Sequence, residues 1–284
     1  MTTAASKATA TQMRPHASAQ RAFMTVSTAC LAHADANQPH LSIDDPEVLH
    51  QFRVAYRRLR SLLSLAREVT KSDPEGMRLK VELRELAANF GEARDLDVFL
   101  ETNSHMSEAD HAKIDAARVR AYEKVAATLD SAAWEKWHDS FDRWLDKGKW
   151  RKSLGDEPWT GRTLARHALS RRRSRIVGMG KSLDELSAYD RHQVRIEAKK
   201  LRYGCQFFAP LWPEQAAEIS AMEKSLATIQ DALGKLNDAA TWEHMVALAD
   251  LDHTDAPHVD EDVQLVRAQN AVDELTGHKP FWRV

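Results

Sequence analysis

Apolar residues recur along most of the chain at spacings of three and four, the period of an α-helix that buries one face. Near the N-terminus this spacing joins Phe23, Val26, Cys30 and Leu31. Runs in which Val or Ile alternates with polar residues are absent, and Gly and Pro are few. The pattern predicts an all-α protein.

A segment that begins at His50 is repeated in the second half of the chain. Residues 50–60 read His-Gln-Phe-Arg-Val-Ala-Tyr-Arg-Arg-Leu-Arg, and residues 192–202 read His-Gln-Val-Arg-Ile-Glu-Ala-Lys-Lys-Leu-Arg. The charged positions and the apolar positions on the core side are kept in type. Such a repeat indicates that the chain is a duplication of one helical unit.

A second block repeats at nearly the same offset. Its apolar residues, glycine and aspartate are Leu79, Leu83, Leu86, Phe90, Gly91 and Asp95 in the first half, matched by Met222, Leu226, Ile229, Leu233, Gly234 and Asp238 in the second. Glycine commonly follows the last turn of a helix, so we expect helices that end at Gly91 and Gly234. The length suits four helices per half, which predicts two repeated antiparallel four-helix bundles with a pseudo-twofold relation.

The repeat also sets the domain boundaries. We expect one helical domain over residues 17–275, with a first bundle over 17–147 and a second over 160–275. Residues 1–16 are expected to form a flexible N-terminal tail, and residues 276–284 a C-terminal tail. The connection between the bundles is marked by Gly148, Gly155, Pro158 and Gly161.

Two helix starts carry capping signals. Asp45 precedes Pro46, and proline is favoured at the first helical position. Ser187 is followed three residues later by Asp190, which fits a capping box. We therefore expect a helix to begin just before each copy of the repeat.

Large aromatic residues and cysteines are assigned to the interior. The aromatic residues at helical spacing before the connection are Trp134, Trp137, Phe141 and Trp144. This spacing favours packing within or between the bundles over a platform for stacking bases. Cys30 and Cys205 lie far apart in the sequence, so we expect two buried thiols without a disulfide.

The net charge of −2 conceals an uneven distribution of charge. Between Arg162 and Arg202 the cations are Arg166, Arg171, Arg172, Arg173, Arg175, Lys181, Arg191, Arg195, Lys199 and Lys200. The acids of the same stretch are Asp184, Glu185, Asp190 and Glu197. Because the local field decides which ions bind, the net charge does not exclude a polyanionic ligand.

In both copies of the repeat, the cations share one face of the predicted helix. These faces carry His50, Arg53, Arg57 and Arg60 in the first copy, and His192, Arg195, Lys199 and Arg202 in the second. The opposite, apolar sides carry Phe52, Tyr56, Leu59 and Leu63 in the first copy, and Val194, Ala198, Leu201 and Cys205 in the second. Neighbouring like charges on a helix repel one another, so a bound anion would stabilise both faces.

Further basic residues extend the candidate site. One group is Lys80 and Arg84, and the other is Arg162, Arg166 and Arg173. The members of each group share one face of a predicted helix. Arginine suits phosphate because its planar guanidinium can donate two parallel hydrogen bonds. For a single arginine, a solvated position or an internal ion pair is an equal alternative, with acids such as Asp95, Asp97 and Asp238 as partners. The repetition of the cationic face favours a ligand.

The repeated segments resemble the CHAD family, the conserved histidine α-helical domain. The matching segments are His50 to Arg60, His192 to Tyr203, Gly91 to Val98 and Leu233 to Asp238. The resemblance covers roughly residues 17–275 and implies two repeated four-helix bundles that bind inorganic polyphosphate, in some members at polyphosphate granules.

The resemblance and the cationic faces together give a predicted polyphosphate site. Its residues are His50, Arg53, Arg57, Arg60, Lys80, Arg84, Arg162, Arg166, Arg173, His192, Arg195, Lys199, Arg202 and Tyr203. Many relatives are fused to a triphosphate-tunnel hydrolase domain, for which this chain has no room. The sequence also lacks a Gly-rich phosphate loop, a nucleophile elbow and a carboxylate cluster with ligand spacing. We therefore expect a binding protein without a cofactor, not an enzyme.

Nucleic acid is the main alternative ligand, because the same arginines suit any phosphate backbone. Apart from Tyr203, few aromatic residues lie among the basic positions, which argues against base stacking. A metal-binding scaffold is a weaker alternative, since His50 and His192 lie beside arginines that would repel a cation. A second metal candidate, for which an exposed loop is the favoured interpretation, is the acidic stretch 252–262 with His244, His253 and His258.

Two further expectations concern location and protonation. No apolar run approaches the roughly 20 residues of a membrane helix, and a secretory signal is absent, so we expect a cytoplasmic protein. We expect His50 and His192 to contact phosphate in a proton-linked manner. Neighbouring arginine should lower the pKa of each free imidazole, and bound phosphate should raise it again.

Overall fold

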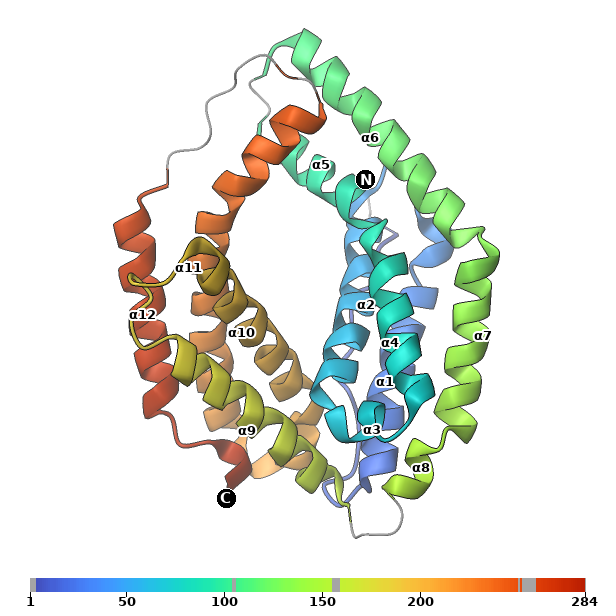
Figure 1. The fold of residues 1–284 in the computed structure, drawn as a ribbon, viewed down its shortest axis with the longest axis vertical. Coiled ribbons are helices and arrows are strands. Elements are labelled where there is room, and N and C mark those ends of the chain that lie inside the picture. The colour runs from blue at the N-terminus through green and yellow to red at the C-terminus, as the bar shows by residue number, and fades with distance from the viewer. Residues whose placement is uncertain (1–3, 104–105, 155–158, 250, 252–258, 284) are drawn as a thin grey trace.

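The computed structural model describes residues 4–103, 106–154, 159–249, 251 and 259–283. These residues form helices joined by short connections (Figure 1). Within them, a single bridge between Ser18 and Thr160 is the one β-type pairing. None of the described helices is long and apolar enough to cross a membrane. The prediction of an all-α fold is confirmed.

The first half is divided into more helices than the sequence predicts. Its α-helices are α1 (Ala19–Asp35), α2 (Pro46–Leu65), α3 (Arg67–Lys71), α4 (Pro74–Ala88), α5 (Gly91–Thr102), α6 (Glu108–Leu129), α7 (Ala132–Lys147) and α8 (Trp150–Ser153). A 3-10 turn, η1 (Gln38–His40), precedes α2. Proline at position 74, with its Asp73 cap, explains one of the breaks, because proline favours the first turn of a new helix.

The second half has four α-helices among the described residues, the number expected. They are α9 (Gly161–Met179), α10 (Ala188–Phe208), α11 (Ala216–Leu248) and α12 (Glu261–Gly277). Short 3-10 turns lie between α10 and α11 and at the C-terminus, namely η2 (Ala209–Leu211), η3 (Pro213–Gln215) and η4 (Phe281–Arg283).

The repeated glycines do not end helices, so that prediction is wrong. Gly91 is the first residue of α5, and Gly234 lies inside the 33-residue α11. A Cβ atom at Gly91 would lie 3.7 Å from the Arg53 guanidinium, and one at Gly234 would lie 3.4 Å from Arg195 Nε. Each glycine is therefore the place where a repeated arginine approaches the neighbouring helix.

One of the two predicted caps is confirmed. The Ser187 hydroxyl accepts a hydrogen bond from the Asp190 amide at 3.1 Å, and α10 begins at the next residue after Ser187. Helix α2 begins at Pro46 as expected, but the Asp45 side chain does not cap it. Instead, Asp45 Oδ2 accepts a hydrogen bond from the amide of Ala4 at 3.0 Å.

Two groups of contacts join the halves. At one end of the molecule, α2 packs on α10 and α1 packs on α9. At the other end, α11 reaches α5, where the Phe99 and Trp242 ring centroids lie 4.6 Å apart. In Figure 1 the first half forms the right-hand side and the second half the left, with α2 and α10 facing the boundary between them.

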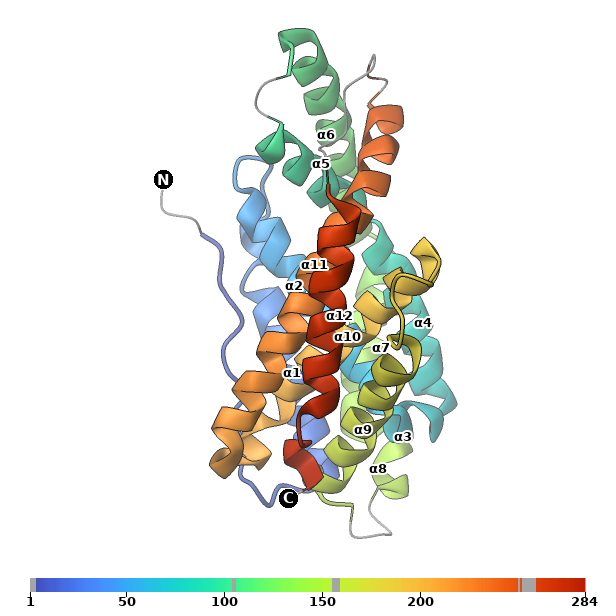
Figure 2. The same ribbon diagram turned by 90° about the vertical axis from the view of Figure 1, so that its left-hand side faces the viewer.

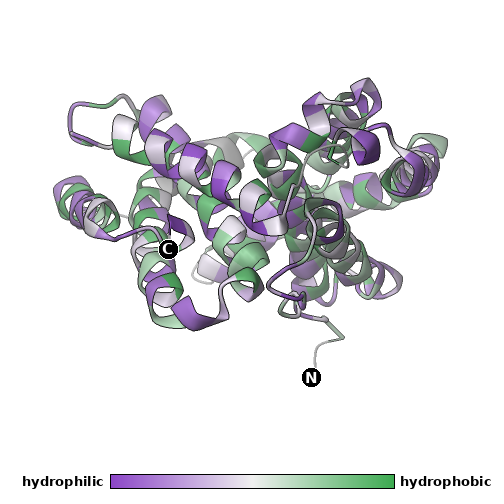
Figure 3. Ribbon diagram, turned by 90° about the horizontal axis from the view of Figure 1, so that it is seen from below, coloured by the Kyte–Doolittle hydropathy of each residue, from purple (hydrophilic) through white to green (hydrophobic). Residues whose placement is uncertain are grey.

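The residues assigned to the interior are buried. They include Trp134, Trp137, Phe141 and Trp144, together with both cysteines. Tyr56 of α2 packs edge-on against Trp134, with centroids 5.1 Å apart, which places these aromatic rings in the core of the first half. Burial raises the pKa of Cys30 to about 12, as expected of an inert thiol. In Figure 3 the helices in view carry both hydrophobic and hydrophilic residues.

Both segments predicted to be tails make specific contacts. The N-terminal segment runs extended along one side of the molecule (Figure 2). The amide of Ser6 donates to Asn37 Oδ1 at 2.9 Å, and its carbonyl lies 2.9 Å from His33 Nε2. At the other terminus, Phe281 and Trp282 are fully buried. A flexible tail would lack such contacts, and an extended polar segment gives no periodic signal by which they could be predicted.

The end of the connection between the halves is hydrogen-bonded to the segment that leads into α1. The amide of Gly161 donates to the carbonyl of Ala17 at 2.7 Å, and the amide of Ala19 donates to that of Trp159 at 2.8 Å. Gly148 caps α7, while Gly155 and Pro158 lie outside the described residues.

A pair of glycine substitutions tests the close packing of α10 on α9. A Cβ atom at Gly204 of α10 would lie 2.7 Å from Leu169 Cδ2, whereas one at Gly178 of α9 meets nothing within 4 Å. Gly178→Ala should raise the free energy of unfolding by up to about 1 kcal/mol through helix propensity. Gly204→Ala should lower it by about 1–3 kcal/mol through overpacking. Urea unfolding checks both, and equal stabilisation by the two changes would contradict the close approach at Gly204.

Candidate anion-binding surface

The apolar sides of the two repeated helices are buried as predicted. All eight residues assigned to them are buried, namely Phe52, Tyr56, Leu59, Leu63, Val194, Ala198, Leu201 and Cys205. The cationic sides remain partly exposed, with His50, Arg53, Arg57 and Arg60 on α2 and His192, Arg195, Lys199 and Arg202 on α10. We call these last eight residues the paired basic face.

Lys199 lies where the two sides of the paired basic face meet. Arg53 and Arg57 act on its ammonium from α2, and Arg195 and Arg202 act on it from α10. Burial and these four charges lower the pKa of Lys199 to about 7. Among the described residues, no acid acts on it comparably. A bound anion would therefore relieve repulsion that the chain leaves uncompensated.

Two arginines of the paired basic face bind the backbone of a neighbouring helix. Arg53 donates hydrogen bonds to the carbonyls of Phe90 and Gly91, where α5 begins. Arg195 Nε donates to the carbonyl of Gln230 on α11 at 3.4 Å. Burial lowers the pKa of Arg53 to about 10. These contacts orient the two guanidinium groups at equivalent places in the two halves.

The repeated histidines have different neighbours. His50 lies near Arg94 of α5, and burial together with Arg94 lowers its pKa, which confirms the expected direction. His192 Nδ1 lies 2.8 Å from Asn237 Oδ1. The repeat aligns Asn237 with Arg94, so the first half has an additional cation where the second has an amide. Arg94 was not among the predicted site residues, although this alignment could have located it.

The two predicted cations of α4 have different surroundings. Arg84 acts on Arg60, whose pKa is lowered by burial and by Arg84 and Arg57. This places Arg84 beside the paired basic face. The pKa of Lys80 is lowered by burial and by a second group of cations, which are Arg172, Lys200, Lys71 and Arg67. None of these four was predicted as a site residue, although Arg172 and Lys200 belong to the basic stretch seen in the sequence.

The three arginines predicted on α9 bind the chain's own backbone. Their acceptors are the carbonyls of Leu211 for Arg162, of Trp282 for Arg166, and of Leu275, Thr276 and His278 for Arg173. They share one face of the helix as predicted, but that face holds the end of α12 and the C-terminal segment. Their placement beside the repeated faces is therefore corrected.

Tyr203 is also displaced from the predicted site. Its side chain is buried and stacks on Phe207, with ring centroids 6.1 Å apart. The Arg58 guanidinium lies 5.5 Å from the Tyr203 centroid. Tyr203 therefore belongs to the packing between α2 and α10, because it lies about 100° around the helix from Arg202.

A single carboxylate neutralises part of the cationic region. Glu197 of α10 accepts from Arg172 at 2.6 Å and from Lys200 at 3.1 Å, and lies 3.6 Å from Arg175. Burial alone would raise the pKa of Glu197, but Arg172 and Lys200 outweigh burial and hold its pKa below the usual range. One acid thus bridges three cations beside the paired basic face.

The acids considered as internal partners of the arginines lie at different places. Asp95 lies 4.0 Å from Arg53, at the limit of an ion pair. The side chain of Asp238 lies outside the described residues. Asp97 is buried, and its Oδ1 accepts from Arg118 Nε at 2.7 Å. Glu223 and Arg202 also interact, whereas the side chains of Arg57, Arg60 and Lys199 make no hydrogen bond or ion pair with the described residues.

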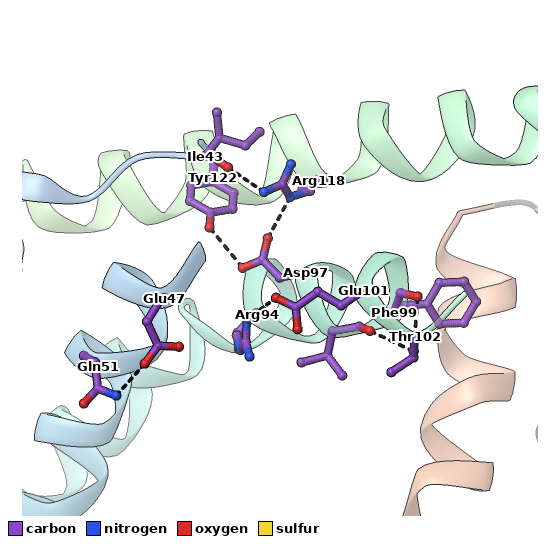
Figure 4. A network of polar contacts seen from close by, with 11 residues as sticks. Ile43, Glu47, Gln51, Arg94, Asp97, Phe99, Glu101, Thr102, Arg118 and Tyr122 are labelled. Atoms are coloured by element: carbon purple, nitrogen blue, oxygen red, sulfur yellow. Dashed lines mark hydrogen bonds and ion pairs between the residues drawn. The ribbon is translucent and has the colours of Figure 1, made fainter. Parts of the chain in front are cut away.

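Asp97 organises the contact between α5 and α6. The Tyr122 hydroxyl donates to Asp97 Oδ2 at 3.0 Å, and Arg118 Nη2 donates to the carbonyl of Ile43 at 2.5 Å (Figure 4). This network joins α5, α6 and the segment that leads into α2. On the same helix, Arg94 pairs with Glu101 at 3.4 Å (Figure 4) and also acts on His50.

Metal ligation has no candidate group in the described part of the chain. No three His, Cys, Asp or Glu side chains gather there in a way that could hold a metal ion. His253, His258 and the side chain of His244 lie outside the described residues.

Comparison with known proteins assigns this arrangement to a family. The CHAD domain model matches residues 25–247, which contain both copies of the His/Arg segment and both repeated glycines. The chain belongs to the CHAD family. This CHAD chain is similar in fold to the crystal structure of the CHAD domain from the plant Ricinus communis, with a TM-score of 0.74 and 23% identity over 97% of this chain and 92% of that chain. No curated protein matches it.

The position of Lys199 in the CHAD chain predicts a pH-dependent cost to stability. Its pKa is about 7 when folded and the usual value for lysine when unfolded, so the unfolded chain binds the proton first as pH falls. Stability should therefore decrease as pH falls from about 10 to 7 and then level off. Lys199→Met should remove this cost, and its stability advantage should grow by about 1–2 kcal/mol between pH 9 and pH 7. Urea unfolding at both pH values measures it. An advantage independent of pH would mean that Lys199 is solvated.

Proposed function

We propose that this CHAD chain binds inorganic polyphosphate along the paired basic face. The observation that carries the proposal is the position of Lys199, on which arginines from two helices act. Phosphates lying between α2 and α10 would compensate the charges of both helices at once. The family to which the chain belongs and the resemblance of its repeated segments support the same ligand.

We also propose that the halves are repeated bundles related by a pseudo-twofold axis. Support comes from the equivalent placement of Arg53 beside Gly91 and of Arg195 beside Gly234. Such an axis would give a bound polymer similar contacts with the cations, whichever way the polymer runs along the surface. Linear polyphosphate has no chemical polarity along its length, so it suits a surface of this kind better than a directional polymer does.

RNA or single-stranded nucleic acid is the second candidate ligand. In nucleic acid, each phosphate is separated from the next by a sugar, which spreads the charge, and proteins compensate by stacking bases on aromatic rings. Tyr203, the one aromatic residue that the sequence places among the cations, is buried against Phe207. On α2 and α10, Tyr189 in the first turn of α10 is the one strongly exposed ring, and this crowding of cations beside so few exposed rings favours polyphosphate.

We propose binding without turnover, so incubation with long-chain polyphosphate should release no orthophosphate. Residence at polyphosphate granules in the cytoplasm would follow from the binding alone. A phosphate-release assay run beside a binding titration separates the two properties, since a hydrolase would shorten the chain while it is bound.

Neutral substitutions on both helices test the proposed site. Arg57→Gln combined with Lys199→Gln should weaken binding of long-chain polyphosphate by about tenfold to a hundredfold at low salt, because two charged contacts are lost. The slope of log affinity against log salt should decrease by about one to two. Neither side chain makes a hydrogen bond or ion pair with the described residues, so the fold should be kept.

The matched control combines Arg120→Gln with Lys147→Gln, which removes the same charge from exposed positions on α6 and α7. Its affinity should stay within about twofold of the parent protein, because distant charges are screened by salt. Equal weakening by both variants would indicate that net charge alone determines binding.

Proton uptake provides an independent test. Bound phosphate should raise the pKa of Lys199 from about 7 and that of His50 from its lowered value, so binding should take up protons and tighten as pH falls from about 9 toward 6. Calorimetry in two buffers of different ionisation enthalpy measures the uptake. Lys199→Met should reduce it at about pH 8, and the His50→Gln, His192→Gln double variant should reduce it at about pH 6.5. Binding without proton uptake would show that neither group contacts phosphate.

A further inference from the structure

A second group of cations surrounds a pocket beside the paired basic face. The pocket has a volume of about 360 Å³ and lies between α9 and the segment from the end of α2 to α4. We call it the junction pocket. It is lined by Ser64, Arg67, Thr70, Lys71, Met77, Lys80, Arg171, Arg172 and Arg175. A volume in this range is typical of pockets for small ligands.

The charges of the junction pocket are only partly compensated. Arg171 pairs with Glu68 at 2.5 Å, and Arg172 pairs with Glu197 at 2.6 Å. Arg67, Lys71 and Lys80 make no hydrogen bond or ion pair with other described residues. The pocket is therefore lined by six cations, of which three lack any internal partner in the described ranges.

Lys80 lies at the centre of this uncompensated charge. The guanidinium groups of Arg67 and Arg172 and the ammonium groups of Lys71 and Lys200 all act on it, and together with burial they lower its pKa. These residues belong to α3, α4, α9 and α10, so four helices converge on one small volume. An anion in the pocket would contact cations from both halves of the molecule.

The junction pocket borders the paired basic face but is distinct from it. Lys199 and Lys200 are adjacent on α10 and therefore point in directions about 100° apart. Lys199 faces Arg57 of α2, whereas Lys200 faces Lys80 and Glu197. The two basic regions thus lie on either side of this lysine pair.

We propose that the junction pocket is a separate binding site for a short inorganic oligophosphate such as tripolyphosphate. A ligand that compensates several cations in a small volume needs several negative charges close together, which adjoining phosphoanhydride groups supply. Three of the lining residues are arginines of α9, whose guanidinium groups suit phosphate oxygens. A monovalent anion would leave most of the charge uncompensated.

The lining of the junction pocket also argues against a nucleotide. It contains no aromatic ring, and Met77 is its one large apolar residue. A base bound there would lack a surface on which to stack. We therefore expect ATP to bind no more tightly than tripolyphosphate, since only the phosphates are recognised.

The Glu197 carboxylate would compete with a bound phosphate for the same cations. Its carboxylate bridges Arg172, Arg175 and Lys200 at distances of 2.6–3.6 Å. A phosphate that approaches the same cations must displace or repel this carboxylate. Glu197→Gln should therefore tighten binding of tripolyphosphate, because the amide keeps the shape and removes the negative charge.

Calorimetric titration of the full chain with tripolyphosphate tests the proposal. The parent protein should bind one molecule at the junction pocket, and Lys80→Met combined with Arg175→Met should weaken this binding by about tenfold or more. Lys199→Met, which removes one charge from the paired basic face, should leave the affinity within about threefold. Glu197→Gln should tighten it, a gain that misfolding cannot imitate.

The opposite pattern would overturn the proposal. If tripolyphosphate does not bind, or if Lys199→Met weakens binding as much as the Lys80→Met, Arg175→Met variant does, the junction pocket is not a separate site. Unchanged or weaker binding by a folded Glu197→Gln variant would also contradict it. Long-chain polyphosphate is titrated separately against the Arg57→Gln, Lys199→Gln variant, so failure at the junction pocket is distinguishable from failure of the proposed function.

Discussion

The packing of α2 on α10 brings two cationic helix faces together, and the rest of the polar structure depends on this constraint. Because the apolar sides of both helices are buried, their basic sides lie close to one another beside the contact. Lys199 shows the consequence, since burial and the arginines of both helices lower its pKa to about 7. Charge held in this way costs stability, which the aromatic core around Tyr56 and Trp134 can offset. A bound anion would reduce this repulsion between the cations, which is the physical basis of the proposed function.

Arginine performs two different tasks in this molecule, and its surroundings decide which. Arg53 and Arg195 contact the backbone of the next helix and still border the paired basic face. Arg162 and Arg173, by contrast, hold the carbonyls of η2 and of the end of α12. The guanidinium group is suited to both tasks because it donates several hydrogen bonds in a fixed plane. Glu197 adds a local balance, since one buried carboxylate compensates three cations.

Periodicity and repetition in the sequence predicted the helical class, the buried sides of α2 and α10, and the cations opposite them. These features follow from spacing along one helix, which a sequence displays directly. Contacts between helices were harder to predict. The α9 arginines share a face as expected, yet the direction of that face depends on where α12 ends. Gly234 resembles a helix-ending residue in the sequence, but inside α11 it makes room for Arg195. The Lys80 surroundings arise only when four helices converge, so no local pattern contains them.

We propose that the paired basic face suits closely spaced phosphates better than a nucleic-acid backbone. Competition between long-chain polyphosphate and single-stranded RNA, at matched phosphate concentration and fixed salt, measures this preference directly. Polyphosphate should displace bound RNA while RNA fails to displace polyphosphate, and Arg57→Gln with Lys199→Gln should reduce the difference between them. Displacement of polyphosphate by RNA at equal phosphate would contradict it.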